Sequence, residues 1–263
     1  MSPGLSVCVA ASIADRLVRL PLAPYSRGMA DPRRPWTVLP HDAFQKLDER
    51  LWLVRGHIPG LKMPLRRIMT VIRRDDGGLV IHSAIALSEP SMSELERFGR
   101  PSLLIVPNGW HRLDAFAWKE RYPALTVVCP AKAEKRVAQC VPVDGTLATF
   151  PSDGVVRAEP LDGLPAEGVL VVQCAAGTSL VFGDTFMNQP HMEGGEGFFY
   201  KLLGVSGGPR VHPFLKWMGK RKPLRAHLLR LAETPGLVRL IPGHGEVVDA
   251  DASAVLRAAA ERM

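Results

Sequence analysis

The sequence predicts a mixed α/β (α+β) fold, a four-layer αββα sandwich in which two sheets pack face to face and helices cover both outer sides. First, each half of the chain runs strands first and helices afterwards. Second, several strands are apolar throughout, as strands are when a sheet is covered on both faces. Third, 263 residues with 46% hydrophobic side chains are enough to bury one large core.

The first half is expected to begin as an antiparallel meander and then to alternate between helices and strands. Asp75 to Gly78 is a tight-turn sequence. Ser91 to Glu94 has the form of a helix capping box, and Gly99 is a suitable helix end. Apolar runs predict strands at 51–54, 67–72, 79–82, 103–106 and 125–129, and helical patterns lie at 91–99, 112–121 and 131–138.

The second half repeats the order of strands before helices. Its predicted strands are 155–158, 169–174, 180–182 and 237–241, and its predicted helices are a long region before the last strand and 251–262. The longest uncharged run, 168–183, is interrupted by polar residues and glycine. It is shorter than the roughly 20 apolar residues that a membrane-spanning helix needs, so no transmembrane segment is expected.

The N-terminal residues differ from the rest of the chain. Residues 1–40 contain six prolines and no sustained apolar period, which predicts a loosely ordered extension. Met1 and Met29 are both possible starts of the protein. Residues 41–263 are expected to form a single domain.

The spacing of the cysteines indicates the redox state of the protein's compartment. They stand at positions 8, 129, 140 and 174 and form no C-x-x-C pair, which fits neither a disulfide framework nor a zinc ribbon. We therefore expect free or buried thiols and a reducing, cytoplasmic location.

Ligand-capable residues follow directly on three of the predicted strands, which is where α/β proteins gather their sites. The loop from Asn108 to Asp114 follows strand 103–106. If the next helix began near His111, then His111 and Asp114 would share one helical face and could share a metal or a proton. Alternatively, His111 is a capping residue and Asp114 is a first-turn carboxylate that the helix dipole favours.

The other two places involve glycines. Gly183 precedes Asp184 after strand 180–182, a pattern that is often only a turn. Gly243 and Gly245 flank His244 after the last strand, and because glycines allow close approach, they can aim this imidazole. His82, at the end of another strand, is a further candidate for proton transfer, although a lone strand histidine is more often a hydrogen-bonded core residue.

Taken together, these places resemble the metallo-β-lactamase superfamily, whose fold is the αββα sandwich. The resemblance covers roughly residues 48–262. Its most specific part is 227–231 with Pro235 and Ile241 to Gly245, which resembles the last helix, last strand and metal-binding histidine of the family. Phe182-Gly183-Asp184 resembles the strand end that carries the bridging aspartate. Within the superfamily the sequence most resembles a divergent branch classed as a domain of unknown function, on His82-Ser83, the 108–114 loop and Tyr122-Pro123.

The sequence also departs from the family pattern. The family's His-x-His-x-Asp-His loop is reduced here to one histidine and one aspartate, and no histidine occurs between His111 and His191. In the family the missing histidines hold a first metal. The resemblance thus implies a reduced, mononuclear site of His111, Asp114, Asp184 and His244, which suits Zn²⁺, Mn²⁺ or Fe²⁺. Asp114 or His82 would accept the proton of a metal-activated water.

Most of the net charge of +7 is local. The segment from Gly197 to Ala232 contains eight Lys and Arg residues and no Asp or Glu. It lies between two predicted ligands, so it could overhang the site and bind an anionic small-molecule substrate. Membrane-surface binding and a solvated helical face are alternatives, and nucleic acid is a minor one because no recognised nucleic-acid motif accompanies the charge.

Two function classes remain open from the sequence. One is a metal-dependent hydrolase that acts on an unassigned, possibly anionic substrate. The other is a non-catalytic relative that has lost the metal and uses the same cleft to bind a ligand or a protein. The missing histidines favour the second, whereas the retained Gly183-Asp184 and Pro242 to Gly245 favour the first.

Overall fold

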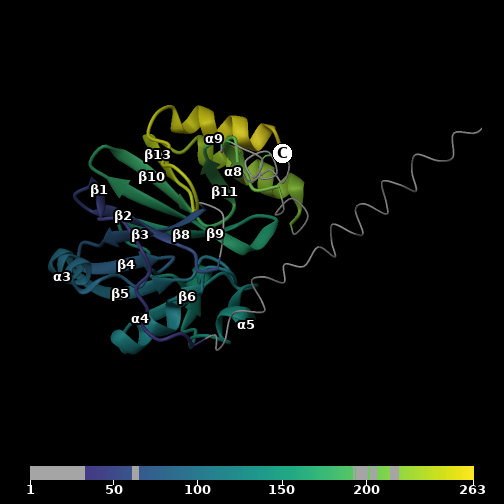
Figure 1. Cartoon of the computed structure of the whole chain (residues 1–263). Coiled ribbons are helices and arrows are strands. Elements are labelled where there is room, and N and C mark those ends of the chain that lie inside the picture. Colours follow the sequence, from purple (N-terminus) through teal and green to yellow (C-terminus); the bar gives the residue numbers. More distant parts are fainter. Residues whose placement is uncertain (1–32, 61–64, 192, 194–200, 202–205, 214–218) are drawn as a thin grey trace, which may run out of the picture.

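The computed structural model contains two sheets packed face to face, with helices on both outer sides (Figure 1). It describes residues 33–60, 65–191, 193, 201, 206–213 and 219–263. The predicted four-layer αββα architecture is confirmed.

The first sheet has seven strands in sequential order. Strands β1 to β4 form the predicted antiparallel meander, and β4 to β7 run parallel. The bounds are β1 Gln45–Asp48, β2 Leu51–His57, β3 Arg66–Arg73, β4 Gly78–His82, β5 Arg100–Ile105, β6 Thr126–Cys129 and β7 Gly145–Thr146.

The second sheet has four strands in the order β13-β10-β9-β8. Its two central strands form an antiparallel hairpin, and β13 pairs with β10 in parallel. The bounds are β8 Val156–Leu161, β9 Leu164–Cys174, β10 Gly177–Phe182 and β13 Leu237–Ile241, and a separate two-stranded ribbon consists of β11 Phe186–Gln189 and β12 Gly208–Val211.

The helices lie in two groups, one on each outer face. Helices α3 Glu89–Phe98, α4 Ala115–Arg121 and α5 Glu134–Val137 pack on the first sheet, and α8 Arg221–Ala232 and α9 Ala252–Glu261 cover the second (Figure 1). Helix α3 begins two residues before the predicted Ser91 because Pro90 favours the first helical turn.

Alternation along the strands divides the core into three layers. In β10, Leu180 and Phe182 pack against α8 and α9, whereas Val181 packs between the sheets. In β3, Met69 and Val71 face the helices of the first sheet, and Ile72 faces the second sheet. Each sheet therefore buries both faces, which explains the continuous apolar runs in the sequence.

The N-terminal extension and the basic segment are described only in part. Of the predicted extension 1–40, residues 1–32 lie outside the described residues, and Trp36 packs on the first core and donates to the Leu87 carbonyl. In the basic segment 197–232, residues 197–200, 202–205 and 214–218 also lie outside the described residues. Its last part forms α8, which buries Leu224, Leu228 and Leu231. Among the described helices, none is both long and apolar enough to span a membrane.

Trp118 of α4 is the largest side chain that is fully buried in the core, and its indole N–H donates to the Ile85 carbonyl. We expect Trp118→Ala to lower the free energy of unfolding by about 3–5 kcal/mol, because it leaves a cavity and an unpaired carbonyl. Urea denaturation followed by circular dichroism measures the loss. Val38→Ala, at a site that is 47% exposed, is the control and should change stability by less than about 0.5 kcal/mol. A loss below about 1 kcal/mol for Trp118→Ala would contradict this packing.

Candidate metal centre

The parallel pairing of β10 with β13 brings two of the predicted ligands together. Val181 and Ile241 are register partners, so the carboxyl ends of both strands lie at one edge of the sheet. Asp184 follows β10 and His244 follows β13 within three residues of that pair. The strand ends thus deliver a carboxylate and an imidazole to the same place.

Glycines at these strand ends allow the two backbones to touch. The Gly243 N–H donates to the Gly183 carbonyl at 3.0 Å. A Cβ atom on Gly243 would lie 2.6 Å from that carbonyl oxygen, and a Cβ on Gly183 would lie 2.6 Å from Glu167 Oε2. Because Cβ atoms do not approach a backbone oxygen this closely, position 243 requires glycine, whereas a side chain at position 183 would displace the Glu167 carboxylate.

The third member of the site, His111, comes from the loop after β5. Asn108 Oδ1 accepts hydrogen bonds from the backbone N–H groups of Trp110 (2.8 Å) and His111 (3.1 Å). This Asx-type turn holds the chain out of a helix, and α4 begins only at Ala115. The expectation of a helix from residue 112 was therefore wrong at its start.

Both histidines contact one oxygen of Asp184. The distances from Asp184 Oδ1 are 2.9 Å to His111 Nε2 and 3.1 Å to His244 Nε2. The ligand atoms of the three residues all lie within 4.8 Å of one another. Their side chains are only 6%, 17% and 11% exposed for His111, Asp184 and His244. The geometry therefore brings two ring nitrogens and a carboxylate together in a site that is largely buried from solvent.

The electrostatics of the group follow from this geometry. Burial acts to raise the pKa of Asp184, but the charge of His111 and hydrogen bonds from both imidazoles hold it well below its ordinary value. Burial acts to lower the pKa of His244, but its hydrogen bond to Asp184 and the charge of that carboxylate raise it above the ordinary value. Asp184 thus needs a cation beside it, and a proton on an imidazole or a metal ion can supply one.

The second nitrogen of each ring is also held. His244 Nδ1 donates to the Arg66 carbonyl at 2.8 Å, and because a carbonyl only accepts, the proton is on Nδ1. In the neutral ring this leaves the lone pair on Nε2, as metal-ligating histidines require. His111 Nδ1 pairs with the Ser83 hydroxyl at 2.7 Å, and Ser83 adopts a left-handed φ of 60° to place it there.

The other oxygen of Asp184 is occupied by an amide. Asn108 Nδ2 donates to Asp184 Oδ2 at 2.9 Å and to Glu167 Oε1 at 2.6 Å. Its orientation is fixed, because Oδ1 already accepts two backbone N–H groups. Glu167 is 2% exposed, and burial together with the charge of Asp184 raises its pKa well above the ordinary value.

The structure does not bring the fourth predicted ligand to this group. Asp114 is fully buried, and its Oδ2 accepts from Arg67 Nη2 and from the Ala86 N–H. Because α4 begins after residue 114, His111 and Asp114 do not share a helical face. Asp114 therefore serves as the partner of a buried arginine in this structure.

His82, the other predicted proton acceptor, lies at the end of β4 and is 3% exposed. Burial and the neighbouring His111 lower its pKa to about 3, so its ring is neutral at pH 7.

Sequence patterns did not indicate the roles of Asn108, Glu167 and Arg67. Glu167 is the one charged residue in the apolar strand β9, and that isolation is the signal that could have found it. Arg67 stands within a predicted strand whose other residues gave no hint that its side chain is buried.

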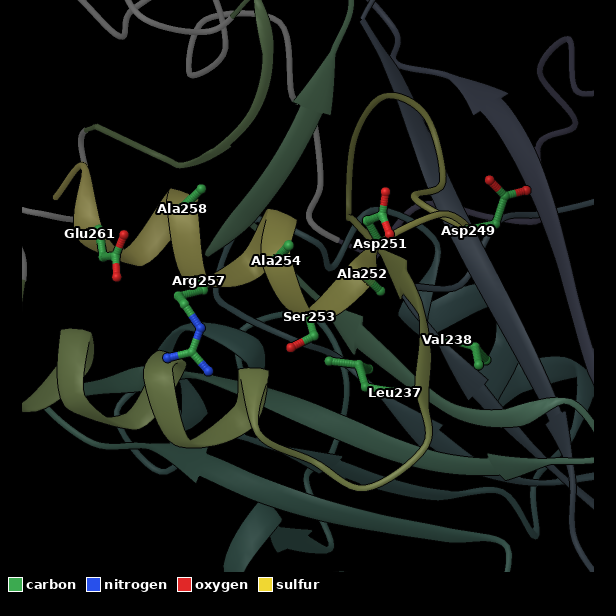
Figure 2. Close-up of a pocket in the computed structure, with 10 residues that line it drawn as sticks. All are labelled: Leu237, Val238, Asp249, Asp251, Ala252, Ser253, Ala254, Arg257, Ala258 and Glu261. Atoms are coloured by element: carbon green, nitrogen blue, oxygen red, sulfur yellow. The ribbon is translucent and has the colours of Figure 1, made fainter.

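A cavity of about 600 Å³ lies elsewhere in the molecule, and none of His111, Asp184 and His244 lines it. It lies along α9 and the start of β13, and it is lined by Asp249, Asp251, Glu261 and Arg257 among others (Figure 2). It contains no histidine or cysteine.

Removal of one partner from the buried pair of Arg67 and Asp114 should destabilise the fold. Arg67→Ala leaves a carboxylate without its partner in the core, and we expect it to cost about 3–5 kcal/mol in urea denaturation. The double variant Arg67→Met/Asp114→Leu removes both charges, and its free energy of unfolding should fall less than that of the single variant. Equal losses in both variants would contradict the assignment of Arg67 as the neutralising charge.

The contact between Gly183 and Gly243 should control metal binding. Gly243→Ala forces the two strand ends apart, so we expect metal affinity to fall at least about tenfold, in line with the effect of disturbing ligand orientation. Titration with a chromogenic zinc chelator measures this. Gly154→Ala, where an added Cβ meets only ordinary contact at 3.8 Å, is the matched control. Unchanged affinity in Gly243→Ala would show that the strand ends need no close approach.

Comparison with solved structures identifies the fold. DIM-1 metallo-β-lactamase exposed to ceftazidime matches with a TM-score of 0.58 and 17% identity, over 86% of this chain and 99% of that one. FIM-1 from Pseudomonas aeruginosa in its mono-zinc form gives 0.56 and 10%, over 86% and 96%. A metallo-β-lactamase from Pontibacter korlensis gives 0.53 and 13%, over 84% and 99%.

No protein-family model and no curated protein sequence matches the chain. The similarity is therefore one of architecture over most of the chain, at identities below one residue in five. The chain is a divergent member of the metallo-β-lactamase fold.

Proposed function

We propose that the protein is a metal-dependent hydrolase with a mononuclear centre formed by His111, Asp184 and His244. The observation that carries the proposal is the convergence of two imidazole Nε2 atoms on a single carboxylate oxygen. A known protein of this fold, FIM-1, has a mono-zinc form, which supports a single metal as a workable arrangement.

The three donors suit the proposed metal. Two imidazole nitrogens and one carboxylate oxygen bind Zn²⁺, Mn²⁺ or Fe²⁺. Three protein ligands leave a coordination position open, which is the pattern of catalytic rather than structural zinc sites. A bound ion would lower the pKa of its water toward about 7 and so provide hydroxide at neutral pH.

The neighbourhood of Asp184 favours one metal over two. Its Oδ2 faces the Asn108 amide, whose N–H groups carry partial positive charge and disfavour a cation there. Burial and the charge of Asp184 raise the pKa of Glu167, which lies behind that amide, well above its ordinary value. Asn108 and Glu167 thus occupy the side of Asp184 on which a second ion would need ligands.

The remaining polar residues orient the ligands. The Arg66 carbonyl and the Ser83 hydroxyl fix the two rings, and Asn108 holds Asp184 so that Oδ1 faces both of them. Asp114 has no proton-transfer role in this centre, because its carboxylate pairs with Arg67. His82 is a weak base at neutral pH, since its pKa is lowered to about 3.

The alternative function is a non-catalytic relative that binds a ligand or a protein in the same cleft. The specific observation in its favour is that Asp184 is already satisfied by three hydrogen-bonding partners without a metal. An anionic small-molecule substrate and a cytoplasmic location remain proposals, supported by the net charge of +7 and by the cysteine spacing.

Metal analysis separates the two functions. The full chain, reconstituted with zinc and desalted, should retain about one ion per chain, as three protein ligands of catalytic type predict. Asp184→Ala and His244→Ala should each retain less than about one tenth of that, because either change leaves two ligands. Hydrolysis of a panel of p-nitrophenyl esters and phosphates should disappear with chelator and in both variants.

Two substitutions outside the site are matched controls. His57→Gln changes an exposed histidine and Asp249→Asn an exposed aspartate, and both should keep the metal. Metal retained by all four variants would show that the ligands are wrong. A wild-type chain that retains no metal would favour the non-catalytic alternative.

A further inference from the structure

A second polar cavity, open to the surface, is lined in part by Arg112, the residue that follows His111 in the chain. It measures about 430 Å³, which is within the range of small-molecule sites. The loop after β5 and the chain around α5 form it. The lining residues are Arg112, Lys132, Lys135, Arg136 and Gln139.

The charge of this cavity is uncompensated. Four of its five lining residues are cations, and among the described residues none of these four takes part in an ion pair. Glu134 is the one acidic residue between 130 and 140, and it does not line the cavity. Burial and the nearby Arg112 lower the pKa of Arg136. Four like charges repel one another in this space, and an anion would relieve that repulsion.

Two of the cations are held in place. Arg112 Nη1 donates to the Arg136 carbonyl and to Gln139 Oε1 at 3.0 Å. The Arg136 guanidinium lies 3.5 Å from the centre of the Trp110 ring, a cation–π contact. A Cβ on Gly109 would come within 2.6 Å of Arg136 Cδ, so the glycine makes room for the arginine stem. Pre-positioned guanidinium groups are the usual binding partners of phosphate and other oxyanions.

We propose that this cavity is a binding site for the phosphate group of a small molecule, or for another oxyanion with two or more negative charges. A multiply charged anion fits better than a single carboxylate, because four cations line the open cavity. A small molecule fits better than a nucleic acid, because the cations converge on one cavity and do not form a track along the surface.

The proposed anion site and the candidate metal centre share one loop. His111 stands between Trp110 and Arg112 in the chain, with neighbouring Cα atoms about 3.8 Å apart. One short loop therefore presents an imidazole to the metal ligands and a guanidinium to the cavity. Anion binding itself requires no metal, so it can be tested separately from the proposed hydrolase.

Calorimetric titration of the full chain tests the proposal, with the protein kept in EDTA and about 0.1 M salt to suppress weak surface binding. We expect pyrophosphate to bind more tightly than inorganic phosphate, and both more tightly than acetate. Lys132→Gln/Lys135→Gln should weaken pyrophosphate binding at least about tenfold, since it removes half of the cations. Both lysines are exposed, so the variant should fold normally, and circular dichroism checks this.

Three further variants show whether the anion binds in this cavity or elsewhere on the chain. Lys222→Gln/Arg225→Gln removes the same charge from the exposed face of α8 and should weaken binding much less than the lysine pair does, since neither residue lines the cavity. His244→Ala should bind pyrophosphate as the wild type does. Arg136→Lys keeps the charge but loses the planar fork, and it should weaken binding in part.

Four results would overturn the proposal. The first is no detectable pyrophosphate binding by the wild type. The second is an equal loss in both double variants, which would indicate general electrostatic attraction. The third is a loss in His244→Ala, which would place the anion at the metal ligands. The fourth is a single-stranded oligonucleotide that binds more tightly with increasing length, which would make this surface a nucleic-acid interface.

Discussion

The candidate centre depends on the close approach of two backbones at Gly183 and Gly243. Parallel pairing of β10 and β13 places their ends side by side, but the side chains that follow converge only because the Gly243 N–H reaches the Gly183 carbonyl. A side chain at either position would collide with backbone or with Glu167. The same two glycines therefore set the distance between the Asp184 carboxylate and the His244 ring, and with it what the site can bind.

Strand β3 of the first sheet completes this arrangement and ties the two sheets together. Its Ile68 N–H donates to the Gly243 carbonyl, and its Arg66 carbonyl accepts from His244 Nδ1. Arg67, between them, pairs with Asp114 in the core. A buried ion pair is a weak source of net stability, but here it holds the strand whose Arg66 carbonyl positions the His244 ring. The geometry of the site thus depends on the contacts between the two sheets.

The sequence predicted the layers, most strands and the placement of Asp184 and His244, because apolar runs and strand-end glycines are local signals. The prediction from sequence was wrong where side-chain hydrogen bonds determine the backbone conformation. Asn108 Oδ1 accepts hydrogen bonds from two backbone N–H groups, and α4 begins only at Ala115. His111 and Asp114, three residues apart, therefore do not lie on one face of a helix. The contact of Asn108 with Glu167 joins residues 59 positions apart, and no local pattern reports such a pair.

The Asn108 amide and the buried Glu167 carboxyl group, whose pKa is raised, lie on one side of Asp184, and two imidazoles lie on the other, so the site is asymmetric. The central claim is that this asymmetry admits one metal ion. Anomalous diffraction at the zinc edge from crystals soaked in zinc tests it most directly. The account predicts a single peak about 2.0–2.2 Å from His111 Nε2, His244 Nε2 and Asp184 Oδ1. A second peak beside Asn108 and Glu167, or no peak between the histidines, would contradict it.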